Sequence, residues 1–324
     1  MNIFVFGGNG FVGKYLSLDL ANLGHSVTIC DVEHSSNHEV YKSVSFKNID
    51  VRDIEQIRKL HIGKEDVVIN LAANQYHNTV PKDAKDFFFS VNTYGTKNII
   101  DVLEEVGCNH FIMYSTDMTY GLPQYIPVDV KHQQKPFGYY GASKYEAEQY
   151  CKSYRSKGNN CTIFRPRIIV GPGRLGILKK LFKLIDKNLP VPMIGSGNNH
   201  YQMISVFDCV SATIKAIEKG CPNDEFNLGS DNPPKIKELL KQLIKEAKSH
   251  SVLIPTWGAA VKFTLSALNT IGIHLMYKEQ YEIADAEYLV DIEHTKKELD
   301  WIPKNSDQDM IKASYSYYLN IERK

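Results

Sequence analysis

Short apolar runs alternate with longer amphipathic segments through the first half of the chain. The runs at 2–6, 26–31, 43–48, 66–71 and 109–115 have the length of buried strands, and the segments near 10–24, 53–61, 82–107 and 138–158 have helical spacing. Strands that alternate with helices in this way are joined by crossovers and therefore lie parallel. The pattern predicts an α/β fold with a doubly wound, Rossmann-type parallel sheet.

The pattern changes after the run TIFRP (162–166). Turn residues break the chain at 171–173, a helix is predicted over 175–187, and residues 188–199 are again dense in turn residues. A helix from near Ser205 and a strand in EFNLG return the chain to the first lobe. We therefore expect a first domain of residues 1–170 with 205–229 returning to it. Residues 171–204 and 230–324 are expected to form a smaller, mostly helical lobe.

Residues 252–277 are apolar for most of their length. Trp257, Val261, Leu265 and Leu268 recur at helical spacing. We expect a helix packed inside the second lobe, and the alternative is a helix lying on a membrane surface. A polar face with one cation, Lys262, favours packing.

Composition narrows the class of protein. At 324 residues and 36.8 kDa the chain can form two lobes, and its net charge of +1 gives no electrostatic footprint for nucleic acid. The six cysteines are scattered, without a CxxC pair or a nearby histidine, which predicts reduced thiols and no metal site. No signal peptide or run of about 18 uncharged apolar residues is visible, so we expect a cytoplasmic protein without a membrane span.

Three glycines, Gly7, Gly10 and Gly13, lie where the first strand meets the first helix. Glycine lets the backbone turn tightly and approach a pyrophosphate, whose charge is stabilised by the N-terminus of the helix. Asp31 ends the next apolar run, about 20 residues further on, where a carboxylate can accept hydrogen bonds from a ribose. The same charge repels a 2′-phosphate. We expect the cofactor to be NAD and not NADP.

Tyr140 and Lys144 stand four residues apart on a predicted helix and so share one face. A nearby ammonium and the nicotinamide cation would lower the pKa of the phenol from about 10 and make it a general acid or base. Thr116 follows a strand in STD and can donate a hydrogen bond to the same substrate oxygen. The three residues together predict proton transfer beside the cofactor.

These motifs resemble the extended short-chain dehydrogenase/reductases, particularly their NAD-dependent epimerase/dehydratase family. GGNGFVG, Asp31, DVRD, NLAA, VNTYGT, STDMTYG, YYGASK and RPRIIVGPG appear in the family's order. The resemblance implies NAD, a catalytic trio of Thr116, Tyr140 and Lys144, and oxidation of a sugar hydroxyl. It also implies a homodimer paired through the helices at 82–107 and 138–158.

The resemblance further implies the cofactor contacts. They are Gly7, Asn9, Gly10, Phe11, Val12 and Gly13 at the phosphates, Asp31 at the ribose, Asp50 and Val51 at the adenine, Leu71, Ala72 and Ala73 along the cofactor, Asn92 behind the active-site helix, Tyr140 and Lys144 at the nicotinamide ribose, and Pro166 beside the nicotinamide.

Departures from the family pattern bear on the substrate. Met118 follows Asp117 where the dehydratases carry a glutamate, and a thioether cannot remove a proton, which counts against 4,6-dehydration. The arginines that grip a diphosphate are absent from the Tyr201 segment and from 278–285. Two roles are open for Arg167 and Arg174: they bind the phosphate, or they pair with the protein's own carboxylates. Asp117, Met118, Arg167, Arg174 and Tyr201 are the candidate substrate residues, and His77 is either a polar loop residue or a further contact.

Three functions remain open. The leading one is 4-epimerisation of a nucleotide sugar through a transient 4-keto intermediate. The second is a dehydrogenase or reductase of a steroid- or lipid-like hydroxyl or ketone, suggested by the missing arginines and the apolar 252–277 segment. The third is a non-catalytic dinucleotide sensor, which would need none of Thr116, Tyr140 and Lys144.

Overall fold

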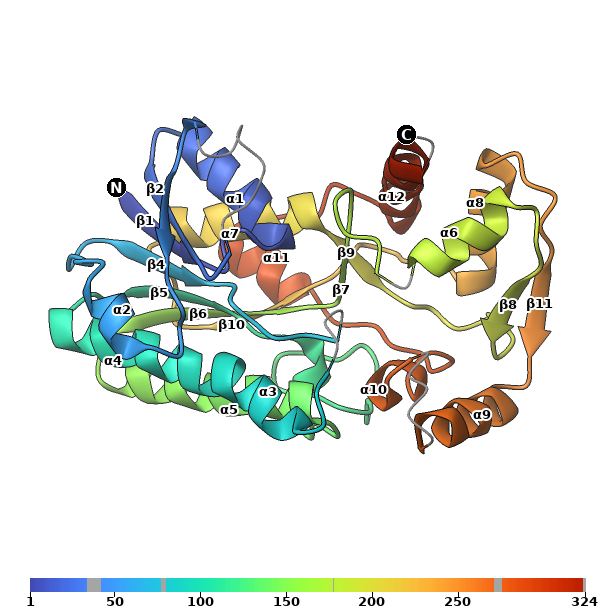
Figure 1. Ribbon diagram of the computed structural model, residues 1–324, viewed down its shortest axis with the longest axis horizontal. Coiled ribbons are helices and arrows are strands. Elements are labelled where there is room, and N and C mark those ends of the chain that lie inside the picture. The colour runs from blue at the N-terminus through green and yellow to red at the C-terminus, as the bar shows by residue number, and fades with distance from the viewer. Residues whose placement is uncertain (34–41, 77–79, 177, 271–275, 323–324) are drawn as a thin grey trace.

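A computed structural model describes residues 1–33, 42–76, 80–176, 178–270 and 276–322 (Figure 1). His77 lies outside the described residues. The central element is a seven-stranded parallel sheet in the order β10-β6-β5-β4-β1-β2-β3. Its strands are β1 (Asn2–Phe6), β2 (Ser26–Asp31), β3 (Ser45–Asn48), β4 (Val67–Asn70), β5 (His110–Tyr114), β6 (Asn160–Pro166) and β10 (Glu225–Leu228). The predicted doubly wound, Rossmann-type sheet is confirmed.

Helices cover both faces of this sheet (Figure 1). One face packs against α1 (Phe11–Asn22) and α7 (Val206–Glu218), and the other against α4 (Thr96–Val106) and α5 (Tyr139–Ser156). The strands are apolar on both sides, as expected of a parallel sheet enclosed by helices. Shorter helices are α2 (Ile54–Arg58) and α3 (Ala84–Phe89). The single helix predicted over 82–107 is interrupted by a π-helical turn at Ser90–Gly95.

The rest of the chain forms a second region around its own core (Figure 1). Its helices are α6 (Leu178–Asp186), α8 (Ile236–Glu246), α9 (Gly258–Thr270), α10 (Lys278–Tyr281) and α12 (Asp307–Glu322). The same region contains two parallel strand pairs. They are β7 (Ile168–Val170) with β9 (Met203–Ser205) and β8 (Val191–Ile194) with β11 (Leu253–Thr256). Helix α11 (Glu293–Leu299) instead packs against β10 and α7 of the main sheet. Strand β10 extends the main sheet, and α7 packs beside α1. The exact division into two domains stays a prediction.

The segment 252–277 differs from the single packed helix that its spacing predicted. Residues 253–256 form β11, because Pro255 and Gly258 disfavour helix and the strand can pair with β8. Only Leu265 of the predicted stripe is buried, whereas Trp257 is 78% exposed. Among the described helices, none has the length and apolar composition to cross a bilayer.

Candidate active site

The glycine-rich loop joins β1 to α1 at the carboxyl edge of the sheet. Gly7 has a φ of 73°, in the left-handed region that favours glycine, and a Cβ there would lie 2.5 Å from the backbone N of Ala72. A Cβ on Gly13 would lie 2.5 Å from the carbonyl oxygen of Gly7. The loop therefore packs backbone against backbone. It brings the N-terminus of α1 to the edge where doubly wound sheets bind phosphate.

Asp31 ends β2 beside this loop. Its carboxylate accepts hydrogen bonds from the backbone N–H of Asn9 at 2.9 Å and of Val32 at 2.8 Å. Burial raises the pKa of Asp31, and these N–H groups oppose that shift. The acidic group stands next to the glycine loop, so the residues present fit an adenosine ribose bound there.

The predicted adenine contacts follow β3. The carboxylate of Asp50 forms an ion pair with Arg52 at 2.5 Å, and this contact lowers the pKa of Asp50. Val51 is buried against Gly95, where a Cβ would lie 2.5 Å from the Val51 side chain. Val51 thus packs against the π-helical turn.

The loop after β4 is tied to α5 through Asn92. Ala72 donates to the side chain of Asn70 at 3.0 Å, and Asn74 donates to the side chain of Asn92 at 2.8 Å. The Asn92 amide then donates to the Ser143 hydroxyl on α5 at 3.0 Å. Asn92 lies in the π-helical turn, a distortion that recurs at functional sites. Leu71 and Ala73 border the same loop, partly exposed.

The predicted catalytic trio comes together at the end of β5. Thr116 follows that strand and accepts a hydrogen bond from the backbone N–H of Met118 at 3.2 Å, while Tyr140 and Lys144 project from α5. Lys144 is 2% exposed and donates to the carbonyl of Tyr114 at 2.8 Å. Burial lowers the pKa of Lys144 to about 8.

Burial dominates the electrostatics of Tyr140 in the protein alone. Burial raises the pKa of Tyr140 to about 12, while Arg174 and a hydrogen bond with Thr116 act in the opposite direction and Asp117 adds to the rise. The predicted lowering depends on Lys144 and the nicotinamide cation together, and it stays a prediction. Desolvation outweighs the nearby charge, and the cation that offsets it is Arg174.

Arg167 pairs with the protein's own carboxylate. Its guanidinium forms a buried ion pair with Asp117 and lies between the rings of Tyr201 and Tyr288, 5.1 Å and 4.0 Å from their centroids. Its side chain is fully buried. Of the two alternatives left open by the sequence, the geometry favours the internal partner.

Arg174 lies between the first helix and the trio. Its guanidinium donates to the side-chain oxygen of Gln75 at 2.6 Å and stands 6.0 Å from the centroid of the Phe11 ring. Burial lowers the pKa of Arg174, and the proximity of Tyr140 opposes this. Pro166 ends β6 at the same edge of the sheet.

Two carboxylates at the site escaped the sequence analysis. Glu279 is 4% exposed and lies against Gly138, where a Cβ would fall 1.1 Å from its oxygen. Neither carboxylate oxygen of Glu279 makes a hydrogen bond of regular geometry. Burial raises the pKa of Glu279 to about 7, and the nearby backbone N–H of Tyr140 opposes this rise. Glu148 is paired with Arg165 at 2.6 Å behind the trio. Gly138, directly before YYGASK, is the one sequence feature that indicates another side chain packed closely at this position.

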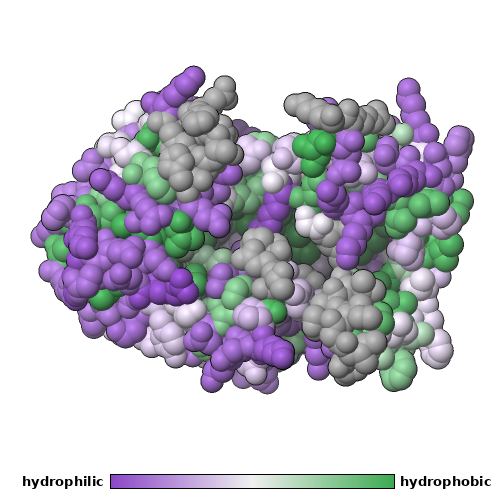
Figure 2. Space-filling model, viewed as in Figure 1, coloured by the Kyte–Doolittle hydropathy of each residue, from purple (hydrophilic) through white to green (hydrophobic). Residues whose placement is uncertain are grey.

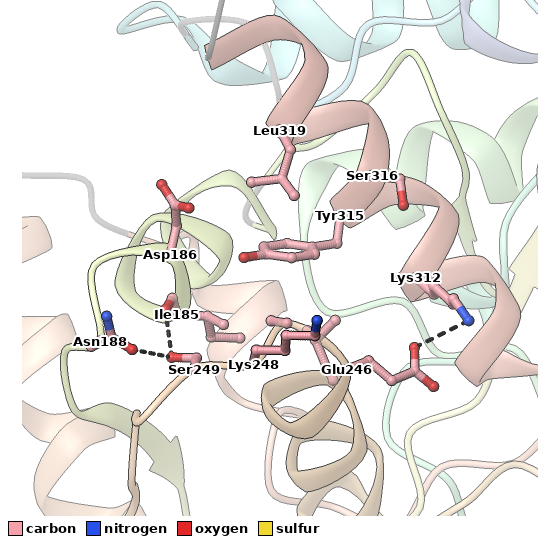
Figure 3. A pocket seen from close by; sticks show the side chains of 12 residues that line it. Ile185, Asp186, Asn188, Glu246, Lys248, Ser249, Lys312, Tyr315, Ser316 and Leu319 are labelled. Carbon is pink, nitrogen blue, oxygen red and sulfur yellow. Dashed lines mark hydrogen bonds and ion pairs between the residues drawn. The ribbon is translucent and has the colours of Figure 1, made fainter.

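A separate surface pocket of about 320 Å³ lies between α6, α8 and α12 (Figure 3). Lys312 and Glu246 pair at 3.6 Å on its wall, and the Ser249 hydroxyl donates to Asn188 at 3.2 Å. No candidate site residue lines this pocket. Within the described ranges, no three potential metal-ligating side chains converge.

Sequence comparison identifies the family. Residues 3–229 match the profile of the NAD dependent epimerase/dehydratase family. The chain therefore belongs to this family, as the motifs predicted. It is an enzyme of the extended short-chain dehydrogenase/reductase type, and its cofactor is NAD.

Relatives of known name agree with this assignment, and a solved structure shares the fold. A putative UDP-glucose 4-epimerase of Methanocaldococcus jannaschii is 29% identical, over 73% of this chain and 79% of that protein. The N-acetyl-alpha-D-glucosaminyl-diphospho-ditrans,octacis-undecaprenol 4-epimerase of Escherichia coli O157:H7 is 30% identical, over 64% of this chain and 61% of that protein. The UDP-glucose 4-epimerase of Thermotoga maritima, solved with UDP-glucose, has the same fold, with 23% identity, a TM-score of 0.79, and coverage of 99% and 100% of the two chains.

Proposed function

We propose that this enzyme inverts C4 of a diphosphate-linked sugar. The observation that carries the proposal is the placement of Tyr140. Its phenol lies within hydrogen-bond reach of Thr116 and close to the cation of Arg174, on a helix that Asn92 ties to the loop beside the glycine turn. A proton-transfer group thus stands at the edge of the sheet where the cofactor binds.

In this proposal Tyr140 removes the proton from the C4 hydroxyl while Thr116 donates a hydrogen bond to the same oxygen. Bound NAD supplies a hydride acceptor and, after reduction, a hydride donor. The sugar turns as a 4-keto intermediate, so that the hydride returns to the opposite face of C4 while Tyr140 returns the proton to the C4 oxygen. Lys144, next to Tyr140 on α5, would hold the ribose of the cofactor. The glycine loop with Asn9, Asp31, Asp50 and Val51 would bind the rest of NAD.

Two features favour epimerisation over elimination of water. Asp117 is buried in an ion pair with Arg167, so its carboxylate already has a partner within the protein. Met118 cannot act as a base. The residues that would carry out 4,6-dehydration are therefore either occupied or missing.

The diphosphate of the substrate needs a positively charged side chain to bind it. Because Asp117 already neutralises the buried guanidinium of Arg167 through Nη1, we assign Arg174 to a substrate phosphate. We place a nucleoside diphosphate sugar first, following the M. jannaschii relative, and a polyprenyl diphosphate sugar second, following the E. coli relative. The two differ in the group attached to the diphosphate and share the chemistry at C4.

We further propose a homodimer paired through α4 and α5, and a cytoplasmic location. The outer side of this helix layer exposes Tyr94, Val106 and Tyr145 by 36% or more, which favours a covering partner. All six cysteines are buried and unpaired, which favours a reducing compartment.

The test is turnover of a substrate panel by the NAD-loaded protein. UDP-glucose, UDP-N-acetylglucosamine, UDP-glucuronate, dTDP-glucose and undecaprenyl diphosphate N-acetylglucosamine are incubated separately, and the C4 configuration is read by proton NMR. We expect inversion of at least one, with deuterium placed at C4 retained in the product because the same hydride returns. Loss of that deuterium to solvent, or product from none of the five, would contradict the proposal.

A further inference from the structure

The outer end of the second region exposes a run of large apolar side chains. Trp257 and Phe263 are the two most exposed large hydrophobic residues in the described part of the chain, at 78% and 77%. Val252 at 59% and Ile254 at 44% precede them on and beside β11. We call Val252, Ile254, Trp257 and Phe263 the apolar end face. Single exposed hydrophobic residues are ordinary, whereas these four lie within twelve positions of sequence, on β11, on α9 and beside them.

Charge is missing from this stretch. Lys262 is the one charged residue in 249–277, and it is turned inward, with its ammonium 2.6 Å from the Asp285 carboxylate and 2.8 Å from the carbonyl of Glu282. The exposed positions of α9 are Ala259, Ala260, Phe263, Thr264, Ser266 and Ala267. The helix therefore presents an uncharged face to solvent.

The two-stranded sheet continues this face. Ile254 of β11 stands opposite Pro192 of β8, and both are exposed, whereas the alternate residues Val191 and Met193 are buried. The sheet thus packs inward on one side and leaves an apolar outer side next to Trp257.

Lysines surround the same end of the molecule. Residues 178–195 and 233–270, which span α6, β8, α8, β11 and α9, contain ten lysines and three acidic residues, although the whole chain carries a net charge of only +1. Lys241 and Lys245 are exposed on α8. Figure 1 places α6 and α8 beside the β8–β11 pair, and Figure 2 shows hydrophobic surface at this end next to hydrophilic residues. Two of the ten lysines, Lys179 and Lys262, pair with Glu322 and Asp285 outside these ranges, and an excess of positive charge remains.

We propose that this end docks on an anionic lipid bilayer, with the apolar end face inserted among the headgroups and the lysines near the acidic lipids. Tryptophan and phenylalanine are stable at that interface, and each basic residue adds attraction to anionic lipid. A second copy of the chain fits less well, because a two-fold axis would bring two lysine-rich surfaces together. A nucleic acid would use the lysines but leave the aliphatic residues exposed to water.

Helix α9 is connected to the catalytic centre through a series of contacts. Helix α9 packs against α10, which begins directly after Tyr277. The Tyr277 ring lies 4.4 Å from that of Tyr76, and the Tyr76 ring lies 5.9 Å from that of Tyr140. The inference is independent of the proposed reaction, because it concerns a surface that takes no part in proton or hydride transfer.

Vesicle binding tests the inference with the full-length, NAD-loaded protein. It is sedimented with phosphatidylcholine vesicles that contain or lack phosphatidylglycerol. We expect binding to the anionic vesicles alone, weakened by salt. We expect at least about tenfold weaker partitioning for W257S/F263S and also for K241E/K245E. The matched control L23S/I302S removes two exposed hydrophobic residues from other elements, 57% and 65% exposed, and should bind as the wild type does.

Fluorescence gives a second readout. The chain has two tryptophans, and Trp301 is 3% exposed. Anionic vesicles should shift the emission of the wild type to shorter wavelength and leave that of W257F unchanged. Absence of vesicle binding, or equal loss in the L23S/I302S control, would overturn the inference. So would a wild-type dimer that W257S/F263S converts to monomer without any vesicle binding, since the face would then join two copies.

Discussion

The buried pair between Arg167 and Asp117 permits the most quantitative prediction. Replacing Arg167 by Met removes the guanidinium and leaves a carboxylate that is only 5% exposed without its partner. Removing one member of a buried ion pair costs roughly 3–5 kcal/mol, because the remaining charge is desolvated and unpaired. Loss of the contacts with the Tyr201 and Tyr288 rings adds to the cost.

Urea denaturation of four proteins measures this effect. Arg167→Met should lower the free energy of unfolding by about 3–5 kcal/mol, and the double variant Arg167→Met/Asp117→Asn should recover part of the loss. Arg58→Met breaks an exposed pair with Glu105 at 2.5 Å and should leave the free energy of unfolding nearly unchanged. The wild type is the reference.

UDP binding by the same proteins distinguishes a structural role of Arg167 from a role in substrate recognition. If Arg167 is a structural residue, the folded Arg167→Met variant should bind UDP nearly as the wild type does. A loss of stability below about 1 kcal/mol together with UDP binding weakened at least about tenfold would refute the reasoning and make Arg167 a phosphate ligand.

Three further outcomes follow from the site. The wild type should bind NAD(H) at least about tenfold more tightly than NADP(H) in calorimetry, because Asp31 repels a 2′-phosphate; equal affinities would contradict this. Arg174→Ala should weaken UDP binding at least about tenfold without changing NAD affinity, and unchanged UDP binding would remove Arg174 from the substrate site. Because burial raises the pKa of Glu279 to about 7, the folded state holds a proton there that the unfolded state has released above its usual pKa of 4.5. Stability should therefore fall as pH rises from about 4.5 to 7, by on the order of 3 kcal/mol from this group, and Glu279→Gln should flatten that part of the melting-temperature profile.

Periodicity and glycine placement predicted the sheet and most of its helices, because both depend on local sequence. Gly7 and Gly13 are required by close backbone contacts, and the strand-to-helix context made them recognisable. The same local reasoning failed at 252–277. There β11 forms because β8, about sixty residues earlier in the sequence, provides a partner strand.

The sequence predicted where the site residues lie better than it predicted their pKa values and ion-pair partners. Thr116, Tyr140 and Lys144 lie together as expected, but the pKa of Tyr140 depends on how deeply the fold buries it and on Arg174, which comes from a distant loop. The partner of Arg167 could be decided only by the packing of Asp117 against it. Glu279 reaches the site from the far end of the chain, and Gly138 alone does not identify which side chain fills the space beside it.

The most direct test of the central claim compares the wild type with Tyr140→Phe on the panel substrate that turns over fastest. The phenylalanine variant keeps the ring and loses only the oxygen that moves the proton. Its rate of C4 inversion should fall roughly 10²–10⁴-fold, while its affinity for NAD stays within about twofold of the wild type. Lys144→Ala should reduce both. Inversion by Tyr140→Phe at the wild-type rate would show that another group transfers the proton and would contradict this account.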